Sequence, residues 1–519
     1  MNPATKKILL LLLAVLLLFG SGQMQKSLNA DRFRLGLTRV AALDNAPPML
    51  AFTTVALGGF RGLISNLLWI RANDLQQDDK FFEAVQLANW ITELEPHFTQ
   101  VWLFLGWNMA YNISVKFKDF PDRWRWVERG VTLLRDQGLR YNPDDVLIYR
   151  ELSWFFQHKM GQNLDDANMY YKFQWSKEMT PYFGANGTNF DALLHPQTPA
   201  EEQRRHQFTN DFKINPEFAK KVDDKYGPLD WRLPEAHAIY WAAVGLDVAG
   251  RHPDKVKQDD LITLRRSIYQ SVFQAFHHGR IIANPFVADS IEEGPNLELI
   301  PEVNSAYETM MAADPAMAEH IGNAHRNFLR DAVYFLYENN RVTEAGKWFK
   351  YLSDKYPNKP IIENDPNSLP ANTTLDQFAV ATVQIDVNET SQERVTSAIE
   401  GLLSRAYYEM AIGQDDRYEG FKLLAGKVYQ RYVSKTSGSN GDKRMPLPPF
   451  PSLNKFVLDQ LLDPQQGVPY GARAVIRSQL GMPGETNAPP VVSTNLPPGT
   501  STNAPGATGT NGPAVAPVD

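Results

Sequence analysis

The stretch ANDLQQDDKFFEAVQLANWITELEP, Ala72–Pro96, decides the fold of this chain. Apolar residues recur at helical spacing on both sides of the polar sequence QQDDK, and a proline closes the second run. The pattern predicts a helix, a turn and a second helix. Ala72 is the small residue of the first helix and Ala84 that of the second, so we expect the two helices to pack closely.

A similar helix begins six residues after Pro96. Trp102 and Leu105 are three residues apart and so share one face of a helix, and Met109 continues the same apolar stripe. Gly106 lies on this face and has no side chain, so we expect a neighbouring helix to approach it closely.

The offsets of Ala84, Pro96, Trp102, Leu105 and Gly106 resemble the tetratricopeptide repeat (TPR), a helical hairpin of about 34 residues. This resemblance covers about half of the chain and implies an all-α, TPR-like solenoid of stacked hairpins with irregular insertions. Tryptophans in these units are expected to be core residues: Trp102, Trp107, Trp124, Trp126, Trp154 and Trp175.

Further units repeat the spacing less regularly. After an insertion at Ile113–Trp124, the second helix of the next unit has Trp126, Val127, Val131 and Leu134 and ends before Pro143. The following unit has Tyr149, Leu152, Ser153, Phe156, Ala167 and Tyr171. A nearly complete unit has Leu329, Ala332, Leu336, Ala345, Phe349, Leu352 and Pro357 around a turn at Asn339–Arg341, and a degenerate last one includes Gly420 and Leu424.

The whole chain also resembles a group of long, membrane-anchored bacterial proteins with degenerate repeats of this kind. The residues that carry this second resemblance are LGGFRG at Leu57–Gly62, LWIRA at Leu68–Ala72 and WNMAYNISV at Trp107–Val115. The resemblance implies an envelope protein and brings no activity with it.

Composition excludes several classes of function. The formal net charge is −7 and no lysine- or arginine-rich block occurs, so we expect no nucleic-acid partner. Cysteine is absent, which excludes disulfides, thiolate zinc sites and iron–sulfur clusters.

The N-terminus predicts export. Lys6 and Lys7 precede the apolar run Ile8–Phe19, the pattern of a secretion signal or membrane anchor. Uncleaved, it would tether the exported body to the cell membrane; cleaved, it would leave a secreted or periplasmic protein. A second apolar segment, Pro47–Asp74, predicts a helix pair at the start of the body, with contact to the membrane surface left open.

The predicted organisation therefore has seven parts. They are a signal or anchor at 1–30, apolar lead-in helices at 31–66, TPR-like repeats at 67–180, an irregular helical insertion at 181–301, TPR-like repeats at 302–436, a Pro-rich segment with a short helix at 437–482, and a disordered tail at 483–519. Within the insertion we expect a long loop at 181–203 and then a helical hairpin from about Pro234. The residues 376–396 are predicted as a helix or an extended excursion.

Candidate chemistry is sparse. His277 and His278 have Glu292 and Glu293 downstream, but adjacent histidines point about 100° apart on a helix, so no metal site is predicted. Four acidic pairs recur, and three of them fall in or beside predicted turns, where aspartate caps backbone donors: the pairs are Asp78–Asp79, Asp165–Asp166, Asp259–Asp260 and Asp415–Asp416. The sequence predicts no catalytic residue and no cofactor.

The predicted function is that of a non-enzymatic, membrane-tethered scaffold. Its concave groove would bind a protein or peptide partner in the cell envelope. The alternative is an envelope enzyme or glycan-binding protein with a site near His277 and His278. The polar residues expected to line the groove are Asn73, Asn108, Tyr111, Asn112 and Arg150.

Overall fold

A computed structural model describes residues 60–485 except 163, 283, 287–290, 314, 316, 363–364, 386–391 and 437–446, together with five isolated residues before position 32. The described chain forms two compact units. The first comprises the described residues up to Leu336 with Thr343–Ile361 and Asp365–Leu375; the second comprises Tyr337–Val342, Ile362 and the described residues from Asp376.

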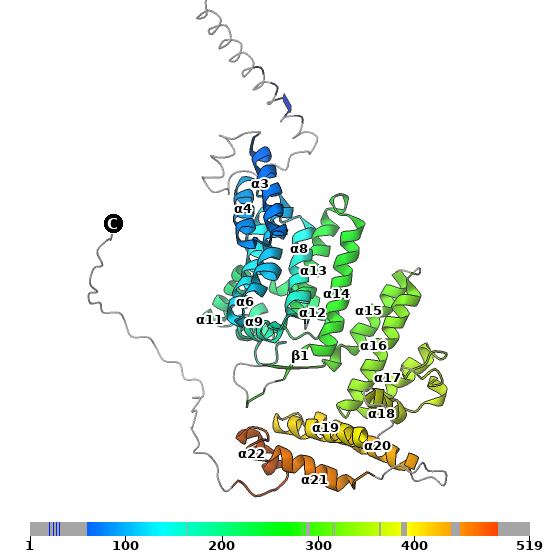
Figure 1. The fold of residues 1–519 in the computed structure, drawn as a ribbon. Helices are drawn as coiled ribbons and strands as arrows, with labels where there is room; N and C mark the ends of the chain where they lie inside the picture. The colour runs from blue at the N-terminus through cyan, green and yellow to red at the C-terminus, as the bar shows by residue number, and fades with distance from the viewer. Residues whose placement is uncertain are drawn as a thin grey trace, which may run out of the picture. The chain divides into compact units, whose positions relative to one another are not determined.

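The described chain is all-α, as predicted, apart from two strands of three residues each (Figure 1). None of its helices combines the length and hydropathy needed to cross a bilayer. The predicted anchor at 1–30, most of the lead-in segment at 31–66 and nearly all of the tail at 483–519 lie outside the described residues.

The first hairpin of unit 1 has the predicted helix, turn and helix. α3 (Phe60–Gln77) packs against α4 (Phe81–Leu94), and Ala72 and Ala84 are fully buried. Asp79 has a φ of 60° in the turn, a left-handed conformation that aspartate tolerates better than most residues.

The next helix departs from regular α geometry. α5 (Thr99–Trp107) continues as a π-helical segment, η2 (Asn108–Ile113), and a 3₁₀ turn, Ser114–Lys116, before α6 (Phe120–Thr132) begins. The predicted insertion at Ile113–Trp124 is therefore mostly helical. A Cβ on Gly106 would lie 3.0 Å from Leu134, so this glycine allows the close approach that we expected.

A second π-helical segment ends the second hairpin, and a third lies in the first helix of the third hairpin. α6 passes into η4 (Leu133–Gly138) and α7 (Leu139–Tyr141), and α8 (Val146–Trp154) passes into η5 (Phe155–Met160) before α9 (Asn168–Phe183). The core residues predicted for the hairpin of α8 and α9 are all buried: Tyr149, Leu152, Ser153, Phe156, Ala167 and Tyr171.

The region 181–301 is more regular than predicted. α10 (Asp191–Leu194), α11 (Pro199–Asp211) and α12 (Pro216–Tyr226) precede the hairpin of α13 (Pro234–Arg251) and α14 (Gln258–His278). The loop expected at 181–203 is interrupted by α10 and ends at α11, whose start is stabilised by a reciprocal capping box between Thr198 and Glu201. β1 (Arg280–Ile282) then pairs antiparallel with β2 (Glu292–Gly294), which the sequence analysis did not predict.

The chain continues through four helices: α15 (Ile300–Ala313), α16 (Ala318–Glu338), α17 (Val342–Lys355) and α18 (Leu375–Ile385). The predicted turn at Asn339–Arg341 separates α16 from α17, and Asn340 has a φ of 57°. The segment 376–396 was predicted as a helix or an extended excursion. Its residues up to 385 are helical, as part of α18.

Unit 2 is built around the hairpin of α19 (Gln392–Ala411) and α20 (Asp415–Thr436), on which α21 (Phe450–Leu461) and α22 (Tyr470–Gln479) pack. The short helix expected near Phe456 is longer than predicted, and α22 was not predicted. A Cβ on Gly420 would lie 1.8 Å from the carbonyl oxygen of Glu338, so only glycine fits at this contact.

The tryptophans are not all core residues. Trp102, Trp124 and Trp175 are buried, but Trp107 is 37% exposed, and Trp126 and Trp154 are half-buried. One face of the Trp107 ring is covered by Tyr111, on which it stacks at 4.2 Å between centroids.

Candidate functional site

The asparagine pair predicted for the groove is engaged within its own helix. Asn108 is fully buried, its Nδ2 donates to the carbonyl of Phe104 at 2.8 Å, and its Oδ1 accepts from Nδ2 of Asn112 at 2.8 Å. Asn108 therefore has no surface to offer a partner, and its placement in the groove was wrong. Asn108 can be buried because its amide is satisfied within its own helix, by the carbonyl of Phe104 and the side chain of Asn112, and so needs no hydrogen bond to water.

The other predicted groove residues lie on different helices. Asn73 is half-buried on α3, and Arg150 on α8 donates to Oδ1 of Asp260 on α14 at 2.6 Å. Tyr111 on η2 pairs through its hydroxyl with Nδ1 of His158 at 3.2 Å. Burial, followed by the charge of Glu151, raises the pKa of Tyr111, so this hydroxyl keeps its proton.

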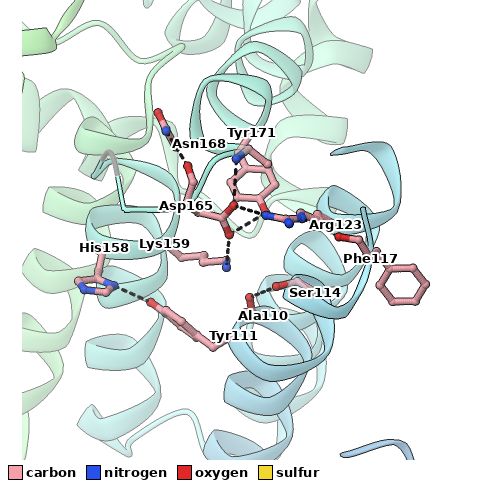
Figure 2. A network of polar contacts seen from close by, with 11 residues as sticks. Ala110, Tyr111, Ser114, Phe117, Arg123, His158, Lys159, Asp165, Asn168 and Tyr171 are labelled. Carbon is pink, nitrogen blue, oxygen red and sulfur yellow. Dashed lines mark hydrogen bonds and ion pairs between the residues drawn. The ribbon is translucent and has the colours of Figure 1, made fainter. Parts of the chain in front are cut away.

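Beside Tyr111 lies a polar network whose centre is Asp165, and the two are linked by Lys159, whose Nζ lies 5.2 Å from the centroid of the Tyr111 ring (Figure 2). The carboxylate of Asp165 accepts from Nη1 of Arg123 at 2.9 Å, from Nζ of Lys159 at 2.5 Å, from the hydroxyl of Tyr171 at 3.1 Å and from the backbone N–H of Ala167 at 2.9 Å. The last bond is the predicted capping role. The other three were missed, because they come from residues on three different helices.

Burial makes this network costly to disturb. The side chains of Lys159 and Asp165 are 4% and 7% exposed. Burial lowers the pKa of Lys159, and the hydrogen bond and charge of Asp165 offset part of that effect. Burial alone would raise the pKa of Asp165, but the hydrogen bonds from Lys159 and Ala167 bring it below its ordinary value.

The network borders a cavity of about 400 Å³. Two of the π-helical segments supply its wall: Tyr111 comes from η2, and His158 and Lys159 come from η5. A π-helical turn shifts the following side chains around the helix axis and is often found at functional sites. The lining residues are Tyr111, Val115, Arg123, His158, Lys159, Leu164, Asp165 and Asp166.

The histidine site proposed as an alternative is not assembled as expected. His277 pairs with the carbonyl of Phe273 and, at 3.2 Å, with the carboxylate of Asp331, whereas Glu293 forms an ion pair with Lys172 at 2.7 Å. His278 is exposed. Within the described residues no group of three or more histidine, aspartate or glutamate side chains is arranged to hold a metal ion.

A buried charge cluster lies beside that ion pair. Lys172 is fully buried, and Glu235, which is 1% exposed, has no hydrogen-bond partner on either carboxyl oxygen. Burial raises the pKa of Glu235 to about 7, the charge of Lys172 lowers it and the charge of Glu293 raises it. Helical periodicity places Glu235 at the start of α13, but it cannot show that β2 brings Glu293 near this position.

A larger groove, whose lining residues are all in unit 1, lies between α14, α15 and α16 and has a volume of about 900 Å³. The residues that line it are Gln162, Gln258, Ile262, Arg265, Arg266, Tyr269, Gln270, Phe273, Gln274, Tyr307, Met310, Met317, His320, Ile321 and Ala324. None of the five predicted groove residues is among them.

In comparisons with known proteins, no family model, curated protein or solved structure matches the chain.

Proposed function

We propose that this protein is a non-enzymatic, membrane-tethered scaffold of TPR-like hairpins that binds a segment of another envelope protein. The observation that carries the proposal is the groove of about 900 Å³ between α14, α15 and α16. A groove between helices suits an amphipathic peptide or helix of a partner.

The lining of this groove is chemically suited to a protein segment. Tyr269, Phe273 and Tyr307 provide aromatic surface, and Met310 and Met317 provide flexible apolar surface that adapts to a partner. Amide side chains that can bond a peptide backbone are interleaved with them: Gln162, Gln258, Gln270 and Gln274.

Charge favours an acidic partner. Arg265 and Arg266 are exposed on α14, and neither forms an ion pair with any residue that the structure describes. No aspartate or glutamate is among the residues that line the groove. A partner segment with carboxylates beside apolar residues would therefore be attracted and oriented by this pair of arginines.

The tether is supported by the sequence Lys6–Phe19 and by the surface of α3. Leu63, Leu67 and Ile70 are 57%, 60% and 59% exposed, and their spacing places them on one face of the helix. Such a stripe on the first described helix after the apolar N-terminal segments suits contact with the bilayer surface.

An enzymatic site at His277 and His278 is the weaker proposal. His277 is engaged by Asp331 and Glu293 by Lys172, so two of the groups expected to act together are bound to other partners.

In vivo photo-crosslinking tests the scaffold proposal. Benzoylphenylalanine at Ile262, in the groove, is expected to capture a defined protein in native cells, and the same label at the exposed Glu202 of α11 is expected to capture none. The double variant Arg265→Glu, Arg266→Glu should abolish the adduct at position 262. An adduct that survives this charge reversal, or one equally strong at position 202, would contradict the proposal.

A further inference from the structure

We propose that the cavity bordered by Tyr111, Arg123 and Lys159 binds a carboxylate that is attached to a short apolar group. This site is separate from the groove between α14, α15 and α16 and does not depend on it, because the two have no lining residue in common.

The first reason is an excess of buried positive charge. Arg123 and Lys159 carry two positive charges, and Asp165 provides one negative charge in contact with both. Their side chains are 15%, 4% and 7% exposed, so solvent neutralises the remaining charge poorly. Asp166 also lines the cavity but is exposed, and water and salt screen its charge more effectively.

The second reason is unused hydrogen-bonding capacity. An ammonium group has three N–H donors, and within the described residues Lys159 donates one hydrogen bond, to Asp165. Arg123 uses Nε for the carbonyl of Phe117 and Nη1 for Asp165. The remaining donors of these two cations can bond an acceptor at the cavity, and a carboxylate, with two charged oxygens, forms the strongest hydrogen bonds with them.

The third reason is the distribution of polar and apolar residues. The cations are buried, whereas Val115 and Leu164 are 48% and 68% exposed and lie where the cavity meets solvent. Tyr111, whose ring contacts Phe155 and Trp107, forms an aromatic wall beside them. A ligand would place its carboxylate against Arg123 and Lys159 and its apolar part against Val115 and Leu164.

The size of the cavity agrees with this ligand class. About 400 Å³ lies within the range of small-molecule sites, at its lower end. The same chemistry occurs in a free organic acid and in the C-terminal residue of a peptide.

Calorimetric titration of the full chain in detergent tests the site with named probes. Sodium butyrate is expected to bind, and butyramide, which has nearly the same shape without the charge, should bind at least about tenfold more weakly, a difference of about 1.4 kcal/mol. Acetyl-alanyl-leucine distinguishes the two sources, since tighter binding than butyrate indicates a peptide terminus and weaker binding a free acid. Either of these two results supports a carboxylate site.

Variants at the mouth locate the binding without disturbing the buried network. Leu164 is exposed, so Leu164→Glu should leave the fold intact and weaken butyrate binding both by repulsion and by loss of the apolar contact, whereas Leu164→Gln loses only the apolar contact and should weaken binding less. Lys159→Met should abolish binding, but it also removes a partner of Asp165, so its thermal midpoint must be measured alongside. Equal affinity for butyrate and butyramide, no heat of binding with butyrate, or unchanged binding in Leu164→Glu would overturn the proposal.

Discussion

The indole Nε1 of Trp102 donates a hydrogen bond of 2.8 Å to the carbonyl oxygen of Pro96, six residues earlier. The hydroxyl of Tyr149 donates an equivalent bond, also 2.8 Å long and also across six residues, to the carbonyl of Pro143. In each case an aromatic residue in the first part of one helix satisfies a carbonyl at the end of the segment before it, where no helical donor is available. The two hairpins are thus joined to their predecessors by the same device with different side chains.

Replacing Trp102 by phenylalanine should remove this bond and reduce the free energy of unfolding by about 1–3 kcal/mol, from the lost bond and the smaller ring. Tyr149→Phe deletes only a hydroxyl, so a loss of about 1 kcal/mol is expected there. Urea denaturation measures both. If Trp102→Phe is as stable as the wild type, the bond to Pro96 does not stabilise the junction, and Asn142, which donates to the same carbonyl at 2.9 Å, is sufficient.

Gly106→Ala tests the close helix contact. The added methyl would lie 3.0 Å from Leu134, and a Cβ built on Gly130 would lie 3.0 Å from the carbonyl oxygen of Gly106, so the two helices are already packed closely here. Overpacking of this kind costs about 1–3 kcal/mol. Gly346→Ala is the matched control, because it is also helical and has no atom within 4 Å of the new Cβ. The control should be neutral or stabilising by up to about 1 kcal/mol, and equal losses in both variants would show that the α5–α6 contact is looser than described.

Glu235→Gln tests the buried charge cluster through pH. Since the pKa of Glu235 is about 7 in the folded protein and near 4.5 when unfolded, the native state holds the proton more tightly between these values. The titration of Glu235 therefore lowers the free energy of unfolding as the pH rises from about 4.5 to about 7. Above about pH 7 the contribution of Glu235 no longer changes with pH. The glutamine variant cannot lose a proton, so it should be more stable than the wild type at about pH 8, by roughly 1–3 kcal/mol, and nearly equal at about pH 5.

The control for this titration is Glu202→Gln, at an exposed position of α11. It should shift stability by less than about 0.5 kcal/mol at either pH. A wild-type protein whose stability does not fall through this interval, or a Glu235→Gln variant with the same pH dependence as the wild type, would contradict a buried carboxyl at position 235.

The helical hairpins could be predicted from the sequence because each depends on the spacing of residues that are close together in the chain. Ala72 and Ala84 lie at fixed offsets, and Gly106 lies on the stripe of Trp102, so periodicity alone assigns their faces. The π-helical segments could not be predicted, since their residue types are the same as those of the α-helices that they continue. Tyr111 on η2 and Lys159 on η5 both line the same cavity.

The charge network could not be predicted for a different reason. Asp165 was expected to cap a backbone donor beside a turn, and its carboxylate accepts from the N–H of Ala167, the residue before α9. Its partners Arg123 and Lys159 are 42 and 6 residues away and lie on other elements, so their convergence depends on tertiary packing. Sequence patterns likewise placed Asn108 on an accessible face, although its amide bonds are satisfied within the helix.

The stripe on α3 provides the last prediction, and the absence of cysteine makes its test direct. Leu67→Cys in the otherwise cysteine-free full chain, labelled with an environment-sensitive fluorophore and reconstituted in vesicles, should be quenched by brominated lipids, because Leu67 is 60% exposed on the helix face proposed to contact the bilayer. Gln203→Cys on α11 is exposed and polar, so its label should be quenched by aqueous iodide and not by the lipids. If the label at position 67 responds to iodide alone, the stripe faces water. If neither quencher reaches it, another part of the chain covers Leu67, and the membrane contact must be assigned elsewhere.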